Sequence, residues 1–442
     1  MLWLSTWLFT KTPLVWFVES YWRDEAFSIL MAQRKWTDIS WLTAQDFSPP
    51  LYYYLLKVWI MVFGSSEIAT RSLSLLCYVM TLFMMVEFLV FAFRFRSRDI
   101  SPVLIPLGLL TPVLAYYAFE ARGYTLLALC ATTSIYALCT KSKKLYALSI
   151  LAGCMTHYSM LFVFATHCLA QLLKWTPFSL KEFIKVSKYP MLITGSWILY
   201  ALYAHQGASP ASFWIPAPRL YDLINAPEML LTGREVSTKA IEYVRSLTTF
   251  AYAVVIFAAF GRVSANKKAT MILLASVILP PLAIYLISTN TPISLYHPRY
   301  MIISTPPLLL LLVTSIRRYK SLHRVILIIW LGLLLYGHLS LKIKGRHKED
   351  LRSQVLHIQR YSNPNDYLYV TSVLDFHPAQ VYWYDKNHVK IMGDTYDAIP
   401  SFVGKSLIPR DALVGDTSPC KDPCRIYVLD HSGQLKVLPK LL

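Results

Sequence analysis

The feature that most constrains this chain is an alternation of long apolar runs with short basic loops. Most of the runs approach the length that a helix needs to cross a bilayer, about 20 residues. The loops between them hold clustered Lys and Arg at 94–98, 141–144, 174–188, 262–268 and 317–324. Because membrane proteins keep such cations in cytoplasmic loops, the pattern predicts a polytopic helical membrane protein with these five loops inside the cell.

Composition supports this prediction. Apolar residues make up 55% of the chain and charged residues only 15%, and the mean hydropathy is +0.43. A soluble fold covers its surface with more charge than that, which excludes a soluble enzyme. The net charge of +18 would suit nucleic-acid binding. However, the five basic loops nearly account for it and leave no basic groove with interleaved aromatic residues, so we expect no nucleic-acid partner.

The apolar runs define an all-α fold of about eleven transmembrane helices, with boundaries good to a few residues. Several runs are shorter than a bilayer core, and the pair that meets at His157 is expected to be tilted. The predicted spans are 2–18, 71–93, 100–117, 124–140, 145–156, 158–173, 189–205, 244–260, 269–287, 301–316 and 325–341.

The first outer loop, residues 19–70, is expected to carry two surface helices. If the apolar run 51–63 crossed the membrane, the basic loop at 94–98 would lie outside the cell, so we place this run on the outer surface. The segment 25–42 has apolar residues near helical spacing with charges between them, which is typical of an interfacial helix. Pro49 and Pro50 separate the two helices.

Two further outer segments follow. The second outer loop, residues 206–243, is rich in Pro and aromatic residues. Residues 342–442 are more polar than the transmembrane domain 1–341 and form a predicted small α/β tail outside the cell, with β-like runs at 366–373 and 425–430. Cys420 and Cys424 in this tail predict a short-loop disulfide, because the outer compartment is oxidising. The sequence contains no N-glycosylation sequon, which favours a bacterial membrane.

Ionisable side chains gather at the outer ends of the predicted spans. Such groups are expensive in a membrane and therefore indicate function. Arginines can clamp a phosphate, and a nearby carboxylate can take the proton of an attacking hydroxyl. Together these groups suit the displacement of a sugar from a phosphate. They are Asp24, Glu25, Asp46, Glu67, Arg71, Glu120, Arg122, His157, His297, Arg299 and Tyr300.

Five stretches of the chain resemble, in their order, bacterial members of the protein O-mannosyltransferase-like group, which is glycosyltransferase family 39 among the C-type membrane glycosyltransferases. The resemblance covers about residues 1–341; the aminoarabinose transferase acting on lipid A is similar in architecture and more distant. The stretches are RDEAFSILMAQ, DFSPPLYYYLLKVWIMVFGSSEIATRSLSLL, YAFEARGYTLLAL, THYSMLFVFATHCLAQLL and HPRYMIISTPPLLLLL.

The resemblance implies an enzyme of the bacterial inner membrane, with its active site and tail outside the cytoplasm. It would move a sugar, with inversion, from a polyprenyl-phosphate donor to a lipid, glycan or protein acceptor. The resemblance implies that Asp24 is the catalytic base, that Glu25 supports it and that Asp46 lies near the acceptor. The residues implied to bind the donor phosphate are Arg71, Arg122, His157 and Arg299, and Tyr300 would add a hydroxyl donor. Relatives often carry His where this chain has Ser48, so no cofactor is certain and a divalent metal at Asp24 and Glu25 is left open.

Structural alternatives accompany these roles. Asp24 could cap the helix that begins at Glu25, and Glu25 could offset the helix dipole. Glu67 and Arg71 lie four residues apart and could pair on one helix. Arg299 could be a snorkelling anchor.

Two other functions also stay open. An O-antigen polymerase or ligase would act on similar lipid-linked sugars. A lipid or solute transporter would need polar groups near the membrane midplane, where this chain is apolar.

Overall fold

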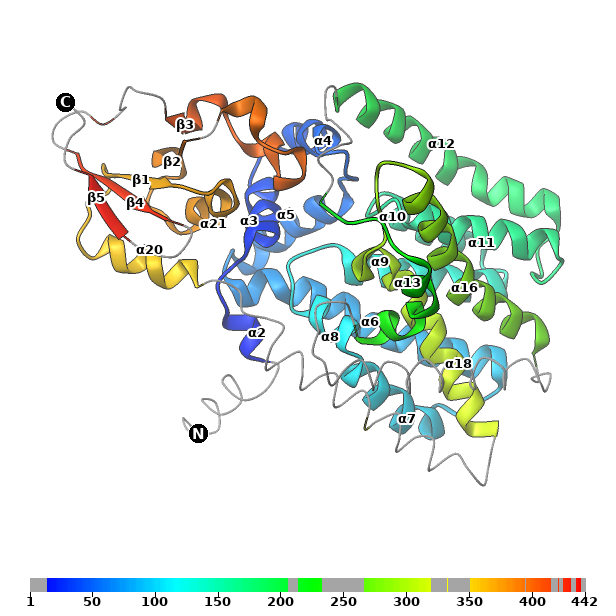
Figure 1. The fold of residues 1–442 in the computed structure, drawn as a ribbon. Helices are drawn as coiled ribbons and strands as arrows, with labels where there is room; N and C mark the ends of the chain where they lie inside the picture. The colour runs from blue at the N-terminus through cyan, green and yellow to red at the C-terminus, as the bar shows by residue number, and fades with distance from the viewer. Residues whose placement is uncertain are drawn as a thin grey trace. The chain divides into compact units, whose positions relative to one another are not determined.

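The computed structural model describes residues 14–205, 214–232, 266–318, 332, 350–393, 395–414, 420, 424–430 and 435–438 (Figure 1). The chain divides into two compact units. Unit 1 comprises Met1–Leu73, Ala201–Ser212 and His347–Leu442, and unit 2 comprises Ser74–Tyr200 and Phe213–Arg346. Each unit is described by itself below.

The first part of unit 1 is a group of short helices. They are α2 (Val15–Val18), α3 (Arg23–Ala32), α4 (Trp36–Gln45), α5 (Leu51–Phe63) and the first turns of α6 (Glu67–Phe93). Helix α5 has the bounds that the sequence predicted, and it ends at Gly64, whose φ of +82° is in the region that favours glycine.

The prediction of a single interfacial helix over 25–42 is wrong. The segment forms two helices, α3 and α4, and every residue of α3 from Glu25 to Ala32 is buried inside unit 1. The reason lies in residues 26–32, which are apolar on all sides of the helix except at Ser28. A helix that is hydrophobic all round becomes a core helix, whereas an interfacial helix keeps one polar face.

The second part of unit 1 is a five-stranded sheet with helices packed on it. Its strands are β1 (Tyr367–Val370), β2 (Val389–Met392), β3 (Leu413–Val414), β4 (Ile426–Leu429) and β5 (Leu435–Leu438), in the order β3-β2-β1-β4-β5. All neighbouring pairs are parallel except β4 and β5. Strands β1 and β4 lie within the two runs where the sequence predicted strands.

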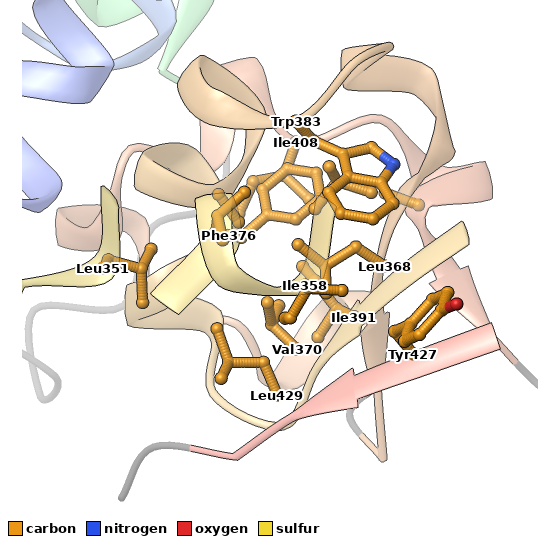
Figure 2. Close-up of a cluster of buried hydrophobic side chains, with 14 of the residues drawn as sticks. Leu351, Ile358, Leu368, Val370, Phe376, Trp383, Ile391, Ile408, Tyr427 and Leu429 are labelled. Carbon is orange, nitrogen blue, oxygen red and sulfur yellow. The ribbon is translucent and has the colours of Figure 1, made fainter. Parts of the chain in front are cut away.

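Helices provide the crossovers that parallel strands require. Helix α21 (Val373–Tyr382) connects β1 to β2, and α20 (Leu351–Gln359) precedes the sheet. Both helices contribute to a core that includes Leu368, Phe376 and Trp383 (Figure 2).

Short 3₁₀ turns complete this part: η4 (Lys386–His388), η5 (Tyr396–Ala398), η6 (Ser401–Val403), η7 (Lys405–Leu407) and η8 (Arg410–Ala412). Cys420 and Cys424 are joined by a disulfide, with their Cα atoms 5.8 Å apart.

Unit 2 is helical throughout its described part. It contains the rest of α6, α7 (Ser97–Leu110), α8 (Pro112–Ala118), α9 (Tyr124–Thr140), α10 (Lys143–Cys154), α11 (Met160–Leu172), α12 (Leu180–Ala204), α13 (Leu220–Ile224), α14 (Ala226–Thr232), α16 (Lys267–Asn290), α17 (Pro298–Met301), η2 (Ile302–Ser304) and α18 (Thr305–Arg318). The last four residues of α12 belong to unit 1.

Two of the described helices, α6 and α16, are long and apolar enough to cross a membrane. Helices α7 and α8 meet at a bend of 72°, and together they make a third span if the bent pair is taken as a single crossing. The sequence predicted this pair as one span over 100–117. It breaks at Thr111, because the ring of Pro112 disfavours helical backbone at the residue before it, and Thr111 has ψ 109°.

The remaining predicted spans give a mixed result. Helices lie at 124–140, 145–156 and 158–173 as predicted, but α9, α10 and α11 have only 17, 12 and 13 residues. The predicted spans 244–260 and 325–341, and most of 2–18, lie outside the described residues apart from Gly332. The structure therefore shows a mostly helical fold with two or three full spans in its described part, and the count of eleven stays a prediction.

Candidate functional site

The acidic pair of the first outer loop lies at the start of α3. Trp22 takes the N-cap position, so Asp24 and Glu25 fall within the first turn. Carboxylates are favourable at this end of a helix because of its partial positive charge. Asp24 accepts a hydrogen bond from the Arg23 Nε at 3.0 Å and its side chain is 12% exposed. Glu25 next to it is fully buried.

Glu25 forms a buried ion pair with Arg71 of α6. The Arg71 Nε and Nη2 donate to the two carboxylate oxygens of Glu25, each at 2.7 Å, and both side chains are 0% exposed. Nη1 and Nη2 also donate to the backbone carbonyls of residues 16, 17, 19 and 20 at 2.8–3.2 Å.

This geometry speaks against the predicted phosphate role of Arg71. A guanidinium has five N–H donors, and here all of them are used on Glu25 and the backbone. The structural alternative, a pair between Arg71 and Glu67, is not formed either. Glu67 instead accepts hydrogen bonds from Arg352 at 3.0 Å and from the Tyr382 hydroxyl at 2.9 Å.

Asp46, the third acid predicted for the site, lies at the C-terminal end of α4. Ser48 donates to the Asp46 Oδ2 at 3.3 Å. Between them Phe47 has φ +50°, which is uncommon for a non-glycine residue. His205 holds this turn: its Nδ1 donates to the Gln45 carbonyl at 2.6 Å, and its ring lies 5.5 Å from that of Phe47.

Metal ligands do not converge in the part of the chain that the structure describes. No three or more His, Cys, Asp or Glu side chains are arranged there to hold an ion. The Ser48 hydroxyl donates to Asp46.

In unit 2 the structure brings Arg122, His157, Arg299 and Tyr300 together around Tyr124, and we name these five residues the cationic cluster. The Cζ atoms of Arg122 and Arg299 lie 5.7 and 5.9 Å from the centre of the Tyr124 ring. The ring of His157 lies 6.1 Å from that of Tyr124 and 4.9 Å from that of Tyr300.

The cluster is assembled from three separate stretches of chain. Arg122 lies in the turn before α9, His157 in the turn between α10 and α11, and Arg299 in α17. In α17 the side chain of His297 caps the helix by accepting from the Arg299 backbone N–H at 3.4 Å. Arg299 is buried and Arg122 is partly exposed. Two guanidinium groups beside one ring provide positive charge, which is suited to an oxyanion.

His157 contributes to the cluster as a neutral ring. Burial, together with the charges of Arg299 and Arg122, lowers the pKa of His157 from 6.5 to about 3. Its Nδ1 accepts a hydrogen bond from the Ser159 backbone N–H at 3.1 Å, so in the neutral ring the proton lies on Nε2. His157 can therefore donate one hydrogen bond to an oxyanion, but it adds no positive charge.

Arg299 is held between aromatic rings. Its side chain stacks on Trp214, with Cζ 4.8 Å from the ring centre, and lies 5.1 Å from the ring centre of Tyr300. Its Nη2 also donates to the Tyr300 hydroxyl at 3.3 Å. These rings are electrically neutral, so they hold the guanidinium without neutralising its charge, and a guanidinium can bind a phosphate through its N–H groups. Burial to 7% exposure makes a simple snorkelling role a poor description of Arg299.

Trp214 was not among the predicted site residues. It lies in the Pro-rich and aromatic second outer loop, and its ring also packs 5.3 Å from His297. The only sequence signal was that an aromatic residue stood in this loop. Nothing in the sequence paired it with Arg299, which lies 85 positions further on.

The fold is similar to that of ArnT from Cupriavidus metallidurans. The apo structure of ArnT matches with a TM-score of 0.58 and 11% identity, over 96% of this chain and 92% of that one. The structure bound to undecaprenyl phosphate matches with a TM-score of 0.59 and 11% identity, over 96% and 93%. No protein-family model and no curated protein matches the sequence.

At this level of identity the likeness establishes the fold. The architecture that the sequence resemblance implied is therefore confirmed.

Proposed function

We propose that this chain is a membrane glycosyltransferase that takes a sugar from a polyprenyl-phosphate donor and transfers it, with inversion, to a lipid, glycan or protein acceptor. The proposed place is the outer face of a bacterial inner membrane. The observation that carries the proposal is the cationic cluster, in a fold similar to that of a protein that has been solved with undecaprenyl phosphate.

The cationic cluster is suited to the phosphate of the donor. Arg122 and Arg299 would bind its oxygens, and their charge would stabilise the phosphate as it leaves the sugar. The neutral ring of His157 and the hydroxyl of Tyr300 would add hydrogen-bond donors beside them. Charged hydrogen bonds of this kind are about twice as strong as neutral ones.

Asp24 is proposed as the base. Its carboxylate would accept the proton of the acceptor hydroxyl while the oxygen attacks the anomeric carbon of the sugar, and the bond from that carbon to the phosphate oxygen breaks. One displacement inverts the anomeric centre. Asp46 is proposed to lie near the acceptor. Glu25 would support Asp24 through its pair with Arg71, which we assign to holding the chain rather than to the phosphate.

The proposal is tested by sugar transfer in membranes that contain the full chain. Labelled polyprenyl-phosphate sugars are supplied and the product is identified by mass spectrometry. We expect Asp24→Asn to lower turnover about 10²- to 10⁴-fold, the usual contribution of a general base. Asp38→Asn, a change to another acid of the same loop, should leave turnover unchanged.

Wild-type turnover in Asp24→Asn would remove the base role. If the wild-type chain released no polyprenyl phosphate with any donor, the transferase itself would be excluded. Activity retained in a chelator would fit the Ser48 substitution and a site that needs no divalent metal.

A further inference from the structure

The short segment that leads into α3 is held by two arginines, and we name residues 16–22 the strap. Every backbone carbonyl from residue 16 to residue 20 accepts a hydrogen bond from one of them. Arg71 takes four of these carbonyls at 2.8–3.2 Å. Arg352 takes the fifth, with Nη2 2.8 Å from the Val18 oxygen. The strap is followed directly by Arg23 and Asp24, so its path sets where α3 begins.

Arg352 comes from a distant part of the sequence. It lies in α20, just before the sheet, and its backbone N–H also donates to the Ser20 hydroxyl at 3.2 Å. Its Nη1 forms an ion pair with Glu67 at 3.0 Å. One guanidinium therefore joins the strap to the first turn of α6, the helix that also carries Arg71.

Tyr382 of α21 makes a second connection of the same kind. Its hydroxyl donates to Glu67 Oε1 at 2.9 Å and accepts from the Tyr21 backbone N–H at 2.8 Å. The rings of Tyr21 and Tyr382 are stacked with their centres 5.9 Å apart. Burial beside Glu67 raises the pKa of Tyr382, so the hydroxyl keeps its proton and stays a donor.

Helix α21 also packs directly on α3 within unit 1. His377 meets Phe27 edge to face, with ring centres 5.8 Å apart. Gly404 closes the contact: a Cβ there would lie 2.5 Å from the Phe27 Cδ2, and its φ of +80° favours glycine. The C-terminal part of unit 1 thus covers the helix that carries Asp24.

We infer that Arg352 and Tyr382 are positioning residues, and that the C-terminal α/β part is a clamp that holds the strap and thereby Asp24. The inference rests on the proposed function for the role of Asp24. Residues 16–18 of the strap are the end of α2 and residues 19–22 connect α2 to α3. The carbonyls at the end of a helix and in the connection after it lack helical partners, and buried carbonyls need other donors. Arg71 alone leaves the Val18 carbonyl unpaired, and Arg352 supplies that bond. If the C-terminal α/β part bound the acceptor instead, the variants below would raise the acceptor KM rather than lower kcat.

The test uses the full chain with Arg352→Met and Arg352→Lys, and with Arg360→Met as the control. Arg360 is an exposed arginine at the end of the same helix. We expect kcat for sugar transfer to fall about tenfold or more in Arg352→Met, because small displacements of a reacting group are costly. The KM values for donor and acceptor should stay within about twofold of wild type. Arg352→Lys keeps the charge opposite Glu67 and should restore part of kcat, while Arg360→Met should equal wild type.

A second measurement follows the strap itself. Backbone amide hydrogen exchange over residues 19–26 should accelerate in Arg352→Met and not in Arg360→Met. If the wild-type chain transfers no sugar, the proposed function fails, while the exchange experiment still decides whether the clamp exists. Tyr382→Phe removes a single oxygen and provides the same test if Arg352→Met does not fold.

The inference is overturned if exchange over 19–26 and kcat are both unchanged in Arg352→Met. It is also overturned if the variant raises only the acceptor KM, because that result assigns the C-terminal part to acceptor binding.

Discussion

Two buried arginines, Arg71 in unit 1 and Arg299 in unit 2, were predicted to bind the same phosphate, and they differ in what their N–H groups contact. The N–H groups of Arg71 donate to the carboxylate of Glu25 and to four backbone carbonyls, and its Cζ lies 5.3 Å from the ring centre of Tyr21. Arg299 lies over the rings of Trp214, Tyr300 and Tyr124, with Cζ 4.8, 5.1 and 5.9 Å from their centres, and donates to the Tyr300 hydroxyl.

The difference separates a structural arginine from a candidate ligand-binding one. A guanidinium binds an oxyanion through the N–H groups of its edge. Where carbonyls and a carboxylate occupy that edge, the charge is already neutralised and the group stabilises the fold. Where neutral aromatic groups surround it, they do not neutralise the charge, which can attract an anion. Three predictions test this difference between the arginines and the surroundings of the cationic cluster.

The largest effect is expected for Arg71→Met. The change leaves Glu25 as a buried charge without its partner and leaves the carbonyls of the strap without donors. We expect the free energy of unfolding to fall by about 3–5 kcal/mol, measured by denaturant unfolding in mild detergent. Adding Glu25→Gln to Arg71→Met should recover part of this loss, because the unpaired charge is then removed. Wild-type stability with lost donor binding would instead make Arg71 a phosphate ligand.

A smaller effect, on binding rather than on folding, is expected for Arg299→Met. The variant should unfold at the wild-type temperature in a thermal scan. Its affinity for a polyprenyl phosphate should fall about 10- to 100-fold, the cost of one charged hydrogen-bonding group. Arg219→Met, which changes an exposed arginine of the second outer loop, is the control and should bind as wild type does. Equal loss in the two variants would show that only the overall positive charge matters.

The smallest effect at pH 7 is expected for His157→Gln, which changes the pH dependence of stability instead. The pKa of His157 is about 3 in the folded chain and about 6.5 when the ring is in water. Between these values the unfolded chain binds a proton that the folded chain does not, so His157 makes stability rise with pH from about 3 to about 6.5.

His157→Gln should flatten this rise, as followed by thermal unfolding between pH 4 and pH 7. His377 in unit 1 is matched to it, because burial, with the charge of Arg23 as a smaller cause, lowers its pKa to about 4. His377→Gln should flatten the rise over the narrower interval from about 4 to 6.5. If stability rose with pH as steeply in a variant as in wild type, the histidine that the variant replaces would be protonated in the folded wild-type chain.

Local patterns were sufficient where a segment depends on its own neighbours. The run 51–63 formed a helix at its predicted bounds, and β1 and β4 lie within the predicted runs. The break at Thr111 had a local signal too, the proline that follows it, but the apolar content of 100–117 concealed it. The two helices within 25–42 had a weaker signal, since nothing in the apolar pattern showed that all sides of α3 would be covered.

The sequence by itself determined that the chain is mostly helical, with apolar runs of membrane-spanning length and costly charges beside them, because hydropathy and cation clustering are local and additive. Only the tertiary structure decided which side chains each charged group contacts. Arg71 pairs with Glu25, 46 positions away, rather than with Glu67 on its own helix, and Trp214 meets Arg299 across 85 positions. The physical reason is that a buried charge takes the partner that satisfies the most donors, and packing rather than sequence distance brings that partner near.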